Sequence, residues 1–501
     1  MLCKFPTFLM ALLVMSLIPA KGQNWNSEEI AKAESMRFRS GHPKAATSEV
    51  GRAYDWRFAS CQWTIDPEIR AISGSVEHFI ALKELTDSVT FDMSQSLEVL
   101  EIRVNGSEIF DFGFVNSEIL YVKSPDFLNG DLHTVYINYQ GVPPTANSSF
   151  NQSSHEGSTP FDVTPEIWTL SQPFGAKDWW PCKMSLDDKL DSVRVAISVP
   201  SEYKAASQGV LEEVSVHPDG YSTYSWMHRY SIPAYLVSMA VSVYEEFSLF
   251  AEVNGHNIEI LNYIFPTRLE GEMERAEATV DLMVLFSELF GTYPYADEKY
   301  GHAQASIPGG MEHSTMSTMA SLIFALNAHE LAHQWFGNKV TCGSWEDIWL
   351  NEGFATYLTG LAYEQLLPEQ WRMWKQGTIN SVTFKPDGSV QVKDTLNRAR
   401  IFNNRLSYDK GAYVLHMLRG VIGDENFFQG CRDFLNHPDL AWGYAHTDDF
   451  IEIMEEASNQ NLDEFFNDWY YGEGYPTYMI EYAFEPNRAI IKVNQSQSDP
   501  S

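Results

Sequence analysis

Two histidines stand four residues apart, with a glutamate after the first, in the stretch NAHELAHQWFGN (residues 327–338). Side chains at positions i and i+4 leave the same face of an α-helix, so the imidazoles of His329 and His333 can share one zinc ion. The H-E-x-x-H pattern indicates a zinc site with a built-in base. An ordinary helix that carries two histidines is the alternative, and a third ligand would favour the metal site.

The stretch WEDIWLNEGFATYL (residues 345–358) supplies a candidate third ligand. Glu352 follows His333 by nineteen residues and stands on a second segment of helical character. Two antiparallel helices joined by a loop would bring this carboxylate against the histidine pair. Three protein ligands leave a fourth position for water, which is typical of catalytic rather than structural zinc. Glu330 is then the expected general base toward this water, whose pKa zinc lowers to about 7.

The elements that would position these residues begin with β structure, from about residue 45 to 245. The stretch EVLEIRVNGSEIF alternates through Leu100, Ile102 and Val104 and then offers an Asn105-Gly106 hairpin turn. The stretches TVYINY and VRVAISVP alternate in the same way. This periodicity of two predicts half-buried strands.

The periodicity becomes helical after about Tyr244. The stretch RLEGEMERAEATVDLMVLFSELFGTYP carries apolar residues at helical spacing and is ended by Gly291 and Pro294. Further helical segments follow to about Tyr471. The last stretch, YPTYMIEYAFEPNRAIIKVNQ, alternates again. An isolated hairpin is marginally stable alone, so either this stretch packs on the catalytic part or the chain stops inside a β domain.

The first residues, MLCKFPTFLMALLVMSLIPAKGQ, place one lysine before a short apolar run and small residues after it. This pattern predicts a signal peptide at residues 1–22 and a secreted or periplasmic protein; a membrane anchor is the alternative. Removing it takes away Lys4 and Lys21 and leaves 32 basic against 67 acidic residues, a net charge of −35. So acidic a chain is a poor binder of nucleic acids and anionic membranes.

Four cysteines remain after that cleavage: Cys61, Cys182, Cys342 and Cys431. They show no C-x-x-C spacing, which argues against a cysteine zinc site. Export permits disulfides, and four cysteines allow three pairings. Four buried free thiols are the alternative.

HELAHQWFGN and WLNEGFATY resemble the zinc aminopeptidases of the aminopeptidase N family of gluzincin metallopeptidases, which includes leukotriene hydrolase. The resemblance implies one Zn²⁺ per chain and a multidomain α+β fold. We expect an N-terminal antiparallel β-sheet domain at residues 23–244 and a thermolysin-like, mainly helical catalytic domain at 245–474. On this resemblance, residues 475–501 would begin a small β sandwich, cut short, and the helical C-terminal domain usual in the family would be absent.

The stretch PGGMEHSTM is similar to the family's G-x-M-E-N exopeptidase motif. The match implies substrate-binding roles for four consecutive residues: Gly309, Gly310, Met311 and Glu312. The carboxylate of Glu312 would bind the free α-ammonium group of the substrate. His313 departs from the family, which usually has asparagine there.

Two further stretches carry the resemblance. SYDKGAYVLHML points to Tyr408 as the catalytic tyrosine, whose phenol would stabilise the oxyanion of the transition state. SQPFGAKDWWPC resembles the family's Q…AR…PC stretch, and counting back from Pro181-Cys182 places Gln172 on the substrate-anchoring glutamine. Lys177 stands where arginine is usual.

The sequence therefore predicts a secreted zinc aminopeptidase that hydrolyses the N-terminal residue from peptides with a free N-terminus. A thermolysin-type endopeptidase shares the zinc ligands and is the nearest alternative. A leukotriene-type epoxide hydrolase and a catalytically inactive binding scaffold are the others. The oligomeric state and the preferred N-terminal side chain are not encoded in these motifs.

Overall fold

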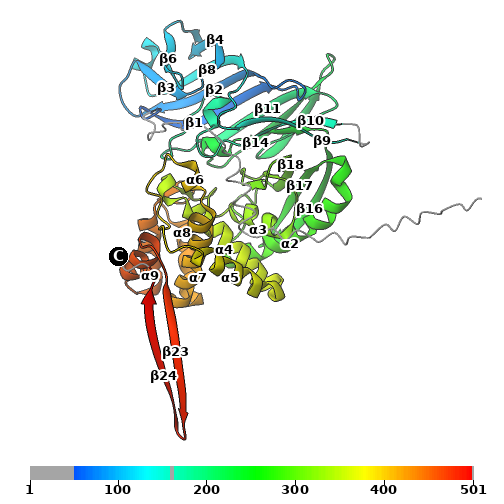
Figure 1. Cartoon of the computed structure of the whole chain (residues 1–501). Helices are drawn as coiled ribbons and strands as arrows, with labels where there is room; N and C mark the ends of the chain where they lie inside the picture. The colour runs from blue at the N-terminus through cyan, green and yellow to red at the C-terminus, as the bar shows by residue number, and fades with distance from the viewer. Residues whose placement is uncertain (1–49, 158–162, 499–501) are drawn as a thin grey trace, which may run out of the picture.

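The computed structural model describes residues 50–157 and 163–498, so the predicted signal peptide, residues 1–22, lies outside the described residues. A β-rich part lies above a part made of a sheet and many helices, and a β-hairpin projects from the far end (Figure 1). No helix within the described ranges is long and apolar enough to cross a membrane.

The largest sheet of the β-rich part has eight strands in the order β13-β14-β11-β1-β2-β8-β4-β5. All its neighbours pair antiparallel except β1 and β11. Its strands are β1 (Tyr54–Thr64), β2 (Ile72–Leu82), β4 (Leu97–Val104), β5 (Ser107–Glu108), β8 (Leu132–Gly141), β11 (Ser192–Pro200), β13 (Val210–Val216) and β14 (Tyr221–His228). The predicted alternation holds in β8, where Val135, Ile137 and Tyr139 are all buried.

Two smaller sheets complete the β-rich part. Their strands are β3 (Ser88–Asp92), β6 (Phe112–Asn116) and β7 (Ile119–Lys123) in one sheet, and β9 (Phe150–Glu156), β10 (Val163–Thr169), β12 (Lys204–Ala206) and β15 (Ala240–Ser242) in the other. Apolar residues from all three sheets share one core with Trp179 and Trp180.

Leu100 does not lie on the buried face that the predicted alternation assigns to it. Its side chain is 48% exposed, whereas Ile102 and Val104 are buried. The register of β4 against β8 shifts between Val99 and Glu101, which indicates a β-bulge. A bulge inserts one residue into the strand and so changes which side chains face the core.

A five-stranded sheet begins the second part of the molecule, where the sequence pattern predicts helices. Its order is β16-β17-β18-β20-β19. The strands are β16 (Glu245–Val253), β17 (His256–Ile264), β18 (Tyr300–Gln304), β19 (Gly310–Met311) and β20 (Ser317–Met319). The central strand β18 is buried at every residue, so it shows no alternation between apolar and polar side chains.

Helices pack against this sheet and fill the lower part of the molecule (Figure 1). They are α2 (Leu269–Phe290), α3 (Phe324–Ala332), α4 (Trp349–Leu366), α5 (Pro368–Thr383), α6 (Arg398–Ile401), α7 (Gly411–Ile422), α8 (Asp424–Asn436), α9 (Thr447–Ser458) and α10 (Asp463–Phe466), with a short bridge between β21 (Thr341–Cys342) and β22 (Tyr444–Ala445). As predicted, α2 ends before Gly291, which has a positive φ of 99°. Helix α4 is buried from Trp349 to Tyr363, so it lies at the centre of this part.

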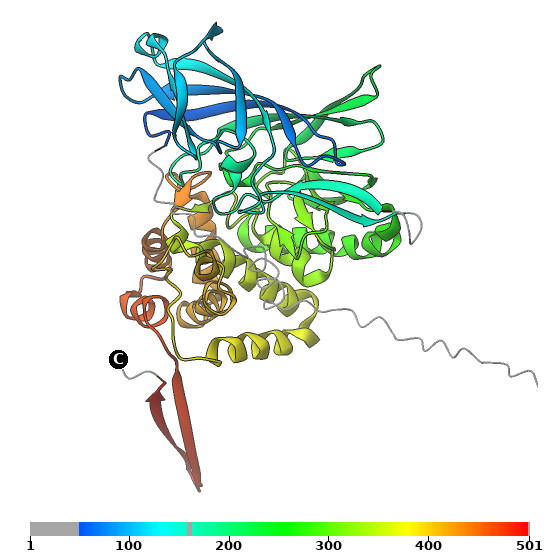
Figure 2. The ribbon, with the colours of Figure 1, turned by 45° about the horizontal axis from the view of Figure 1, so that its top comes forward.

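The C-terminal hairpin consists of β23 (Pro476–Glu485) and β24 (Arg488–Gln497). Two views show it extending away from the helices (Figures 1 and 2). Only Pro476 of its strands is partly buried, so the hairpin does not pack on the catalytic part. The predicted fold class is confirmed: a β-rich N-terminal part, a helical catalytic part and small C-terminal β strands.

Candidate metal centre and active site

The site is built on two adjacent helices, α3 and α4. Helix α3 ends at Ala332 with His333 as its C-cap, and the turn that follows carries Phe336. The ring of Phe336 stacks on Phe354 of α4, with centroids 4.0 Å apart and planes at 6°. Because Phe354 is two residues after Glu352, this contact holds the start of α4 against the end of α3.

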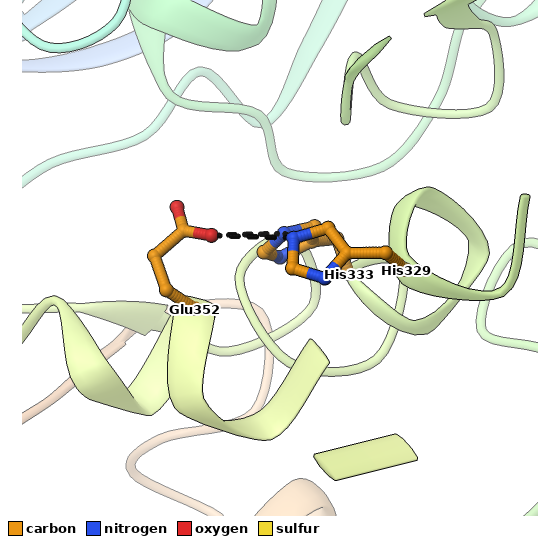
Figure 3. Close-up of side chains that lie close together, drawn as sticks. All are labelled: His329, His333 and Glu352. Carbon is orange, nitrogen blue, oxygen red and sulfur yellow. Dashed lines mark hydrogen bonds and ion pairs between the residues drawn. The ribbon is translucent and has the colours of Figure 1, made fainter. Parts of the chain in front are cut away.

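The structure brings the three predicted metal ligands together (Figure 3). The Nε2 atoms of His329 and His333 lie 3.1 Å apart, and Oε2 of Glu352 lies 3.4 Å and 3.3 Å from them. Ligands bound tetrahedrally at roughly 2.0–2.1 Å from zinc stand about 3.3 Å from one another. The three atoms therefore form one face of a tetrahedron of the size that zinc requires.

The hydrogen bond that His333 makes also favours metal binding. Its Nδ1 lies 3.1 Å from the carbonyl oxygen of Phe336. A carbonyl oxygen only accepts, so Nδ1 donates this hydrogen bond and Nε2 is the nitrogen that can bind a metal. Such a bond from the second ring nitrogen is the usual way to orient a metal-binding histidine.

The electrostatics of the site favour a bound cation. Burial lowers the pKa of His329 to about 4, whereas at His333 burial is outweighed by the carboxylates of Glu312 and Glu352, which raise its pKa to about 10. Burial also disfavours the charged form of Glu352, but the two imidazoles outweigh it and hold its pKa below the usual range. Three carboxylates, those of Glu312, Glu330 and Glu352, are buried here, and a divalent ion would offset their charge.

The predicted exopeptidase motif lies directly against the predicted base. Gly310 belongs to the edge strand β19, and a Cβ atom added to it would lie 2.2 Å from Oε1 of Glu330. A larger residue at this position would push the carboxylate away, so glycine lets Glu330 lie against the main chain. Ligand atoms of Glu312, Glu330 and His333 lie within 4.8 Å of one another, so the base and the ammonium-binding candidate share one site.

Gln172 reaches Glu312 from the β-rich part. It follows β10 in the chain, and its Nε2 donates a hydrogen bond of 2.9 Å to Oε1 of Glu312. Both side chains are buried. Two segments 140 residues apart thus meet where the sequence predicts the substrate amine.

Tyr408 also reaches the metal centre. It lies in a π-helical segment, η6 (Asn404–Lys410), that leads into α7. Its ring is parallel to that of His329 within 15°, at a centroid distance of 6.0 Å. Single π-helical turns are frequent at functional sites, because they re-aim one side chain.

The two departures from the family pattern have local partners. Nδ1 of His313 lies 2.9 Å from the hydroxyl of Thr318 in β20. The ammonium group of Lys177 forms an ion pair of 2.8 Å with Glu118. All four cysteines from Cys61 to Cys431 are buried free thiols, the second of the two predicted alternatives.

The sequence analysis did not single out two buried amides in the turn after α3. Gln334 and Asn338 both contact the main chain of the exopeptidase motif. In the sequence, Gln334 follows His333 by one residue and Asn338 follows it by five. The spacing of four between the two amides is their only signal. Their partners lie 19 and 26 residues earlier, so no local pattern reveals the contact.

Residues 278–469 match the model of the peptidase family M1 domain. This stretch is therefore a peptidase family M1 domain. The match, the M1 zinc metallopeptidases of similar fold and the three-ligand group identify zinc as its cofactor.

Curated M1 relatives are similar over much of this chain. Glutamyl aminopeptidase of Sus scrofa is 28% identical over 66% of this chain and 37% of its own length. Aminopeptidase 2 of Candida albicans is 26% identical over 83% of this chain and 46% of its own length. The chain thus spans less than half the length of these relatives.

A solved structure of an M1 zinc metallopeptidase from Deinococcus radiodurans has the same fold. Its TM-score is 0.73 at 22% identity, and the alignment covers 84% of this chain and 95% of the other. A further structure from that organism, a variant bound to a Tyr-Ser-Ala substrate, aligns equally well.

Proposed function

We propose that this chain is a zinc aminopeptidase that removes the N-terminal residue from peptides with a free N-terminus. His329, His333 and Glu352 are the proposed zinc ligands. The observation that carries the proposal is the position of Glu312, whose carboxylate lies in the metal centre and accepts a hydrogen bond from Gln172. A thermolysin-type endopeptidase needs the same three ligands but no carboxylate reserved for an amine.

Zinc, when bound, polarises the scissile carbonyl and lowers the pKa of its water to about 7. Glu330 takes a proton from the attacking water and later gives it to the leaving amine. Its carboxylate is buried against Gly310, so it is held close to the substrate-binding strand. The phenol of Tyr408 donates a hydrogen bond to the oxygen that gains negative charge.

Glu312 and Gln172 bind the α-ammonium group of the substrate. The amide nitrogen of Gln172 donates to Glu312, so its amide oxygen is the atom that can accept from the ammonium. A carboxylate beside the metal selects a charged N-terminus and places the first peptide carbonyl at the metal. Gly309, Gly310 and Met311 lead into Glu312 and would line the path of the substrate main chain.

The similar proteins support this activity. The relatives are named aminopeptidases, and one structure of similar fold holds a tripeptide substrate. We also propose that the enzyme acts outside the cytoplasm, because residues 1–22 have the pattern of a signal peptide. N-terminal sequencing of the exported protein would test this, and a start before residue 20 would contradict it.

A panel of aminoacyl anilides tests the proposal. We expect hydrolysis of free aminoacyl anilides, loss of activity with a chelator, and recovery when zinc is added back. The matched N-acetyl anilides should not be cleaved. Cleavage of the acetylated substrates would indicate an endopeptidase, and failure of both sets together with an absence of bound zinc would indicate an inactive scaffold.

A further inference from the structure

Residues 312–315 are held to the end of the zinc-binding helix by two side-chain amides. Nδ2 of Asn338 donates a hydrogen bond of 2.7 Å to the main-chain oxygen of Glu312. Oε1 of Gln334 accepts one of 2.9 Å from the main-chain N–H of Thr315, and its Nε2 lies 3.5 Å from the same oxygen of Glu312. Both amides are fully buried. We call Gln334 and Asn338 the amide clamp.

The segment that the clamp holds is strained. Thr315 has a φ of +60°, a left-handed conformation that is unusual for a β-branched residue. Its hydroxyl accepts from the main-chain N–H of Gly209 at 2.8 Å, and its carbonyl accepts from Lys299 at 2.9 Å. Strain of this kind persists only where the surroundings fix the backbone, and it is found mostly at functional sites.

The clamp itself is anchored to the metal-binding helix. The main-chain N–H of Asn338 donates to the carbonyl oxygen of His333 at 3.0 Å. From the β-rich part, the buried ammonium of Lys189 donates to the carbonyl oxygen of Asn338 at 3.0 Å. The residues that hold Glu312 in place are therefore continuous with a proposed zinc ligand.

We propose that Gln334 and Asn338 are positioning residues that set the distance between the ammonium-binding carboxylate and the metal. This inference rests on the proposed aminopeptidase function. The clamp ties the main chain of Glu312 to the helix that carries both histidines, while Gln172 orients its carboxylate. The distance between the carboxylate of Glu312 and the metal decides that one residue and not two is removed from the substrate. The clamp fixes this distance within one rigid unit.

The consequence is specific to ligands that carry an α-ammonium group. Loosening the clamp displaces Glu312 but leaves His329, His333 and Glu352 in place. Misplacement of a binding group by about 1 Å can reduce activity by roughly a hundredfold. Ligands that bind only through the metal would not sense the change.

Two zinc-binding probes separate these effects: leucine hydroxamate and its desamino analogue, which lacks only the α-ammonium group. Calorimetry on the zinc-loaded protein gives both dissociation constants for the wild type, Asn338→Ala and Gln334→Met. We expect each variant to weaken binding of leucine hydroxamate roughly tenfold to a hundredfold. Binding of the desamino analogue and zinc content should stay unchanged.

Asn327→Ala is the matched control. Asn327 is an equally buried asparagine in α3, the helix that precedes the clamp, but its amide donates to the hydroxyl of Thr279 at 2.8 Å and not to the clamped segment. Its variant should bind both probes with the wild-type ratio. In a Glu312→Ala background, where the ammonium site is already lost, adding Asn338→Ala should cause no further loss for leucine hydroxamate.

Three results would overturn the inference: unchanged affinity for leucine hydroxamate in both clamp variants, equal weakening of both probes, or a full additional loss in the Glu312→Ala background. If Asn338→Ala fails to fold, Gln334→Met gives the same test, because methionine keeps the side-chain length without the amide. A wild-type protein that binds both probes equally would contradict the proposed function itself, which distinguishes the two failures.

Discussion

The metal centre and the C-terminal hairpin are the two extremes of this chain. His329, His333 and Glu352 are at most 1% exposed, whereas Tyr482 and Phe484 of the hairpin are 73% and 80% exposed. Both regions carry aromatic and charged residues at regular spacing. In one of them every side chain is surrounded by others, and in the other the side chains meet only solvent and the paired strand.

The contrast shows that the energetic effect of a side chain depends on the groups that surround it. Burial at the metal centre lowers the effective dielectric constant, so that hydrogen bonds and charges there act strongly. In the hairpin the same residue types are screened by water, and an exposed ion pair such as Glu481–Lys492 contributes little. Substitutions of one residue type in both regions make this comparison quantitative.

We expect the greatest loss of activity when the buried Glu330 is exchanged. Exchanging Glu330→Gln removes the proposed general base and should lower kcat by roughly 10²–10⁴-fold, while zinc content stays at the wild-type level. The matched change Glu481→Gln in the hairpin should leave kcat unchanged. Turnover of a leucyl anilide and metal analysis measure both; near-wild-type turnover by Glu330→Gln would remove it from the mechanism.

The next largest effect on activity is expected when one tyrosine is exchanged in each region, Tyr408 at the metal centre and Tyr482 in the hairpin. Tyr408→Phe deletes one hydroxyl that stabilises the transition state and should reduce kcat by about 10²–10³-fold, with little change in KM. Tyr482→Phe deletes the same group from an exposed ring and should change neither constant. Steady-state kinetics decides, and a change confined to KM would show that Tyr408 binds substrate instead.

Exchanging one phenylalanine for alanine in each region compares how much the two regions contribute to the stability of the fold. Phe354→Ala removes a buried ring that stacks on Phe336 and should cost about 3–5 kcal/mol. Phe484→Ala removes an exposed ring and should change the free energy of unfolding by less than about 0.5 kcal/mol. Denaturant unfolding of the two variants measures the difference; equal losses would mean that the hairpin is covered in solution.

The smallest effect is expected at an exposed histidine, His446, that is paired with the buried carboxylate of Asp347. Nδ1 of His446 lies 2.8 Å from Oδ2 of Asp347, and this hydrogen bond raises the pKa of His446 above its ordinary value of 6.5. The raised pKa stabilises the folded state fully below about pH 6.5, and the stabilisation is lost as the pH rises through the folded pKa. The difference in melting temperature between wild type and His446→Gln should therefore shrink from pH 5.5 to pH 9, and a constant difference would contradict the assignment.

The sequence predicts those parts of the molecule whose signals are local. His329 and His333 lie one helical turn apart, so their spacing alone places both rings on one face, and β8 alternates because one of its faces is buried. The bulge that exposes Leu100 is set by the register with a neighbouring strand. Strand β18 was missed because both its faces are buried and no alternation remains.

Contacts between distant segments account for the rest. The partner of Gln172 lies 140 residues away, and the clamp joins residues on either side of α3. Family resemblance implies roles for Gln172 and Tyr408 but none for Gln334 or Asn338, although both lie in a stretch that carries the resemblance. The alternation in the last stretch predicts β23 and β24, yet periodicity cannot say whether another element covers them.

The central claim is that His329, His333 and Glu352 bind one zinc ion. The most direct test is a crystal structure of the zinc-loaded protein with diffraction data collected on both sides of the zinc absorption edge. We expect a single strong anomalous peak about 2.0–2.2 Å from Nε2 of both histidines and from a carboxylate oxygen of Glu352. A peak elsewhere, or none at this site in zinc-loaded crystals, would contradict it.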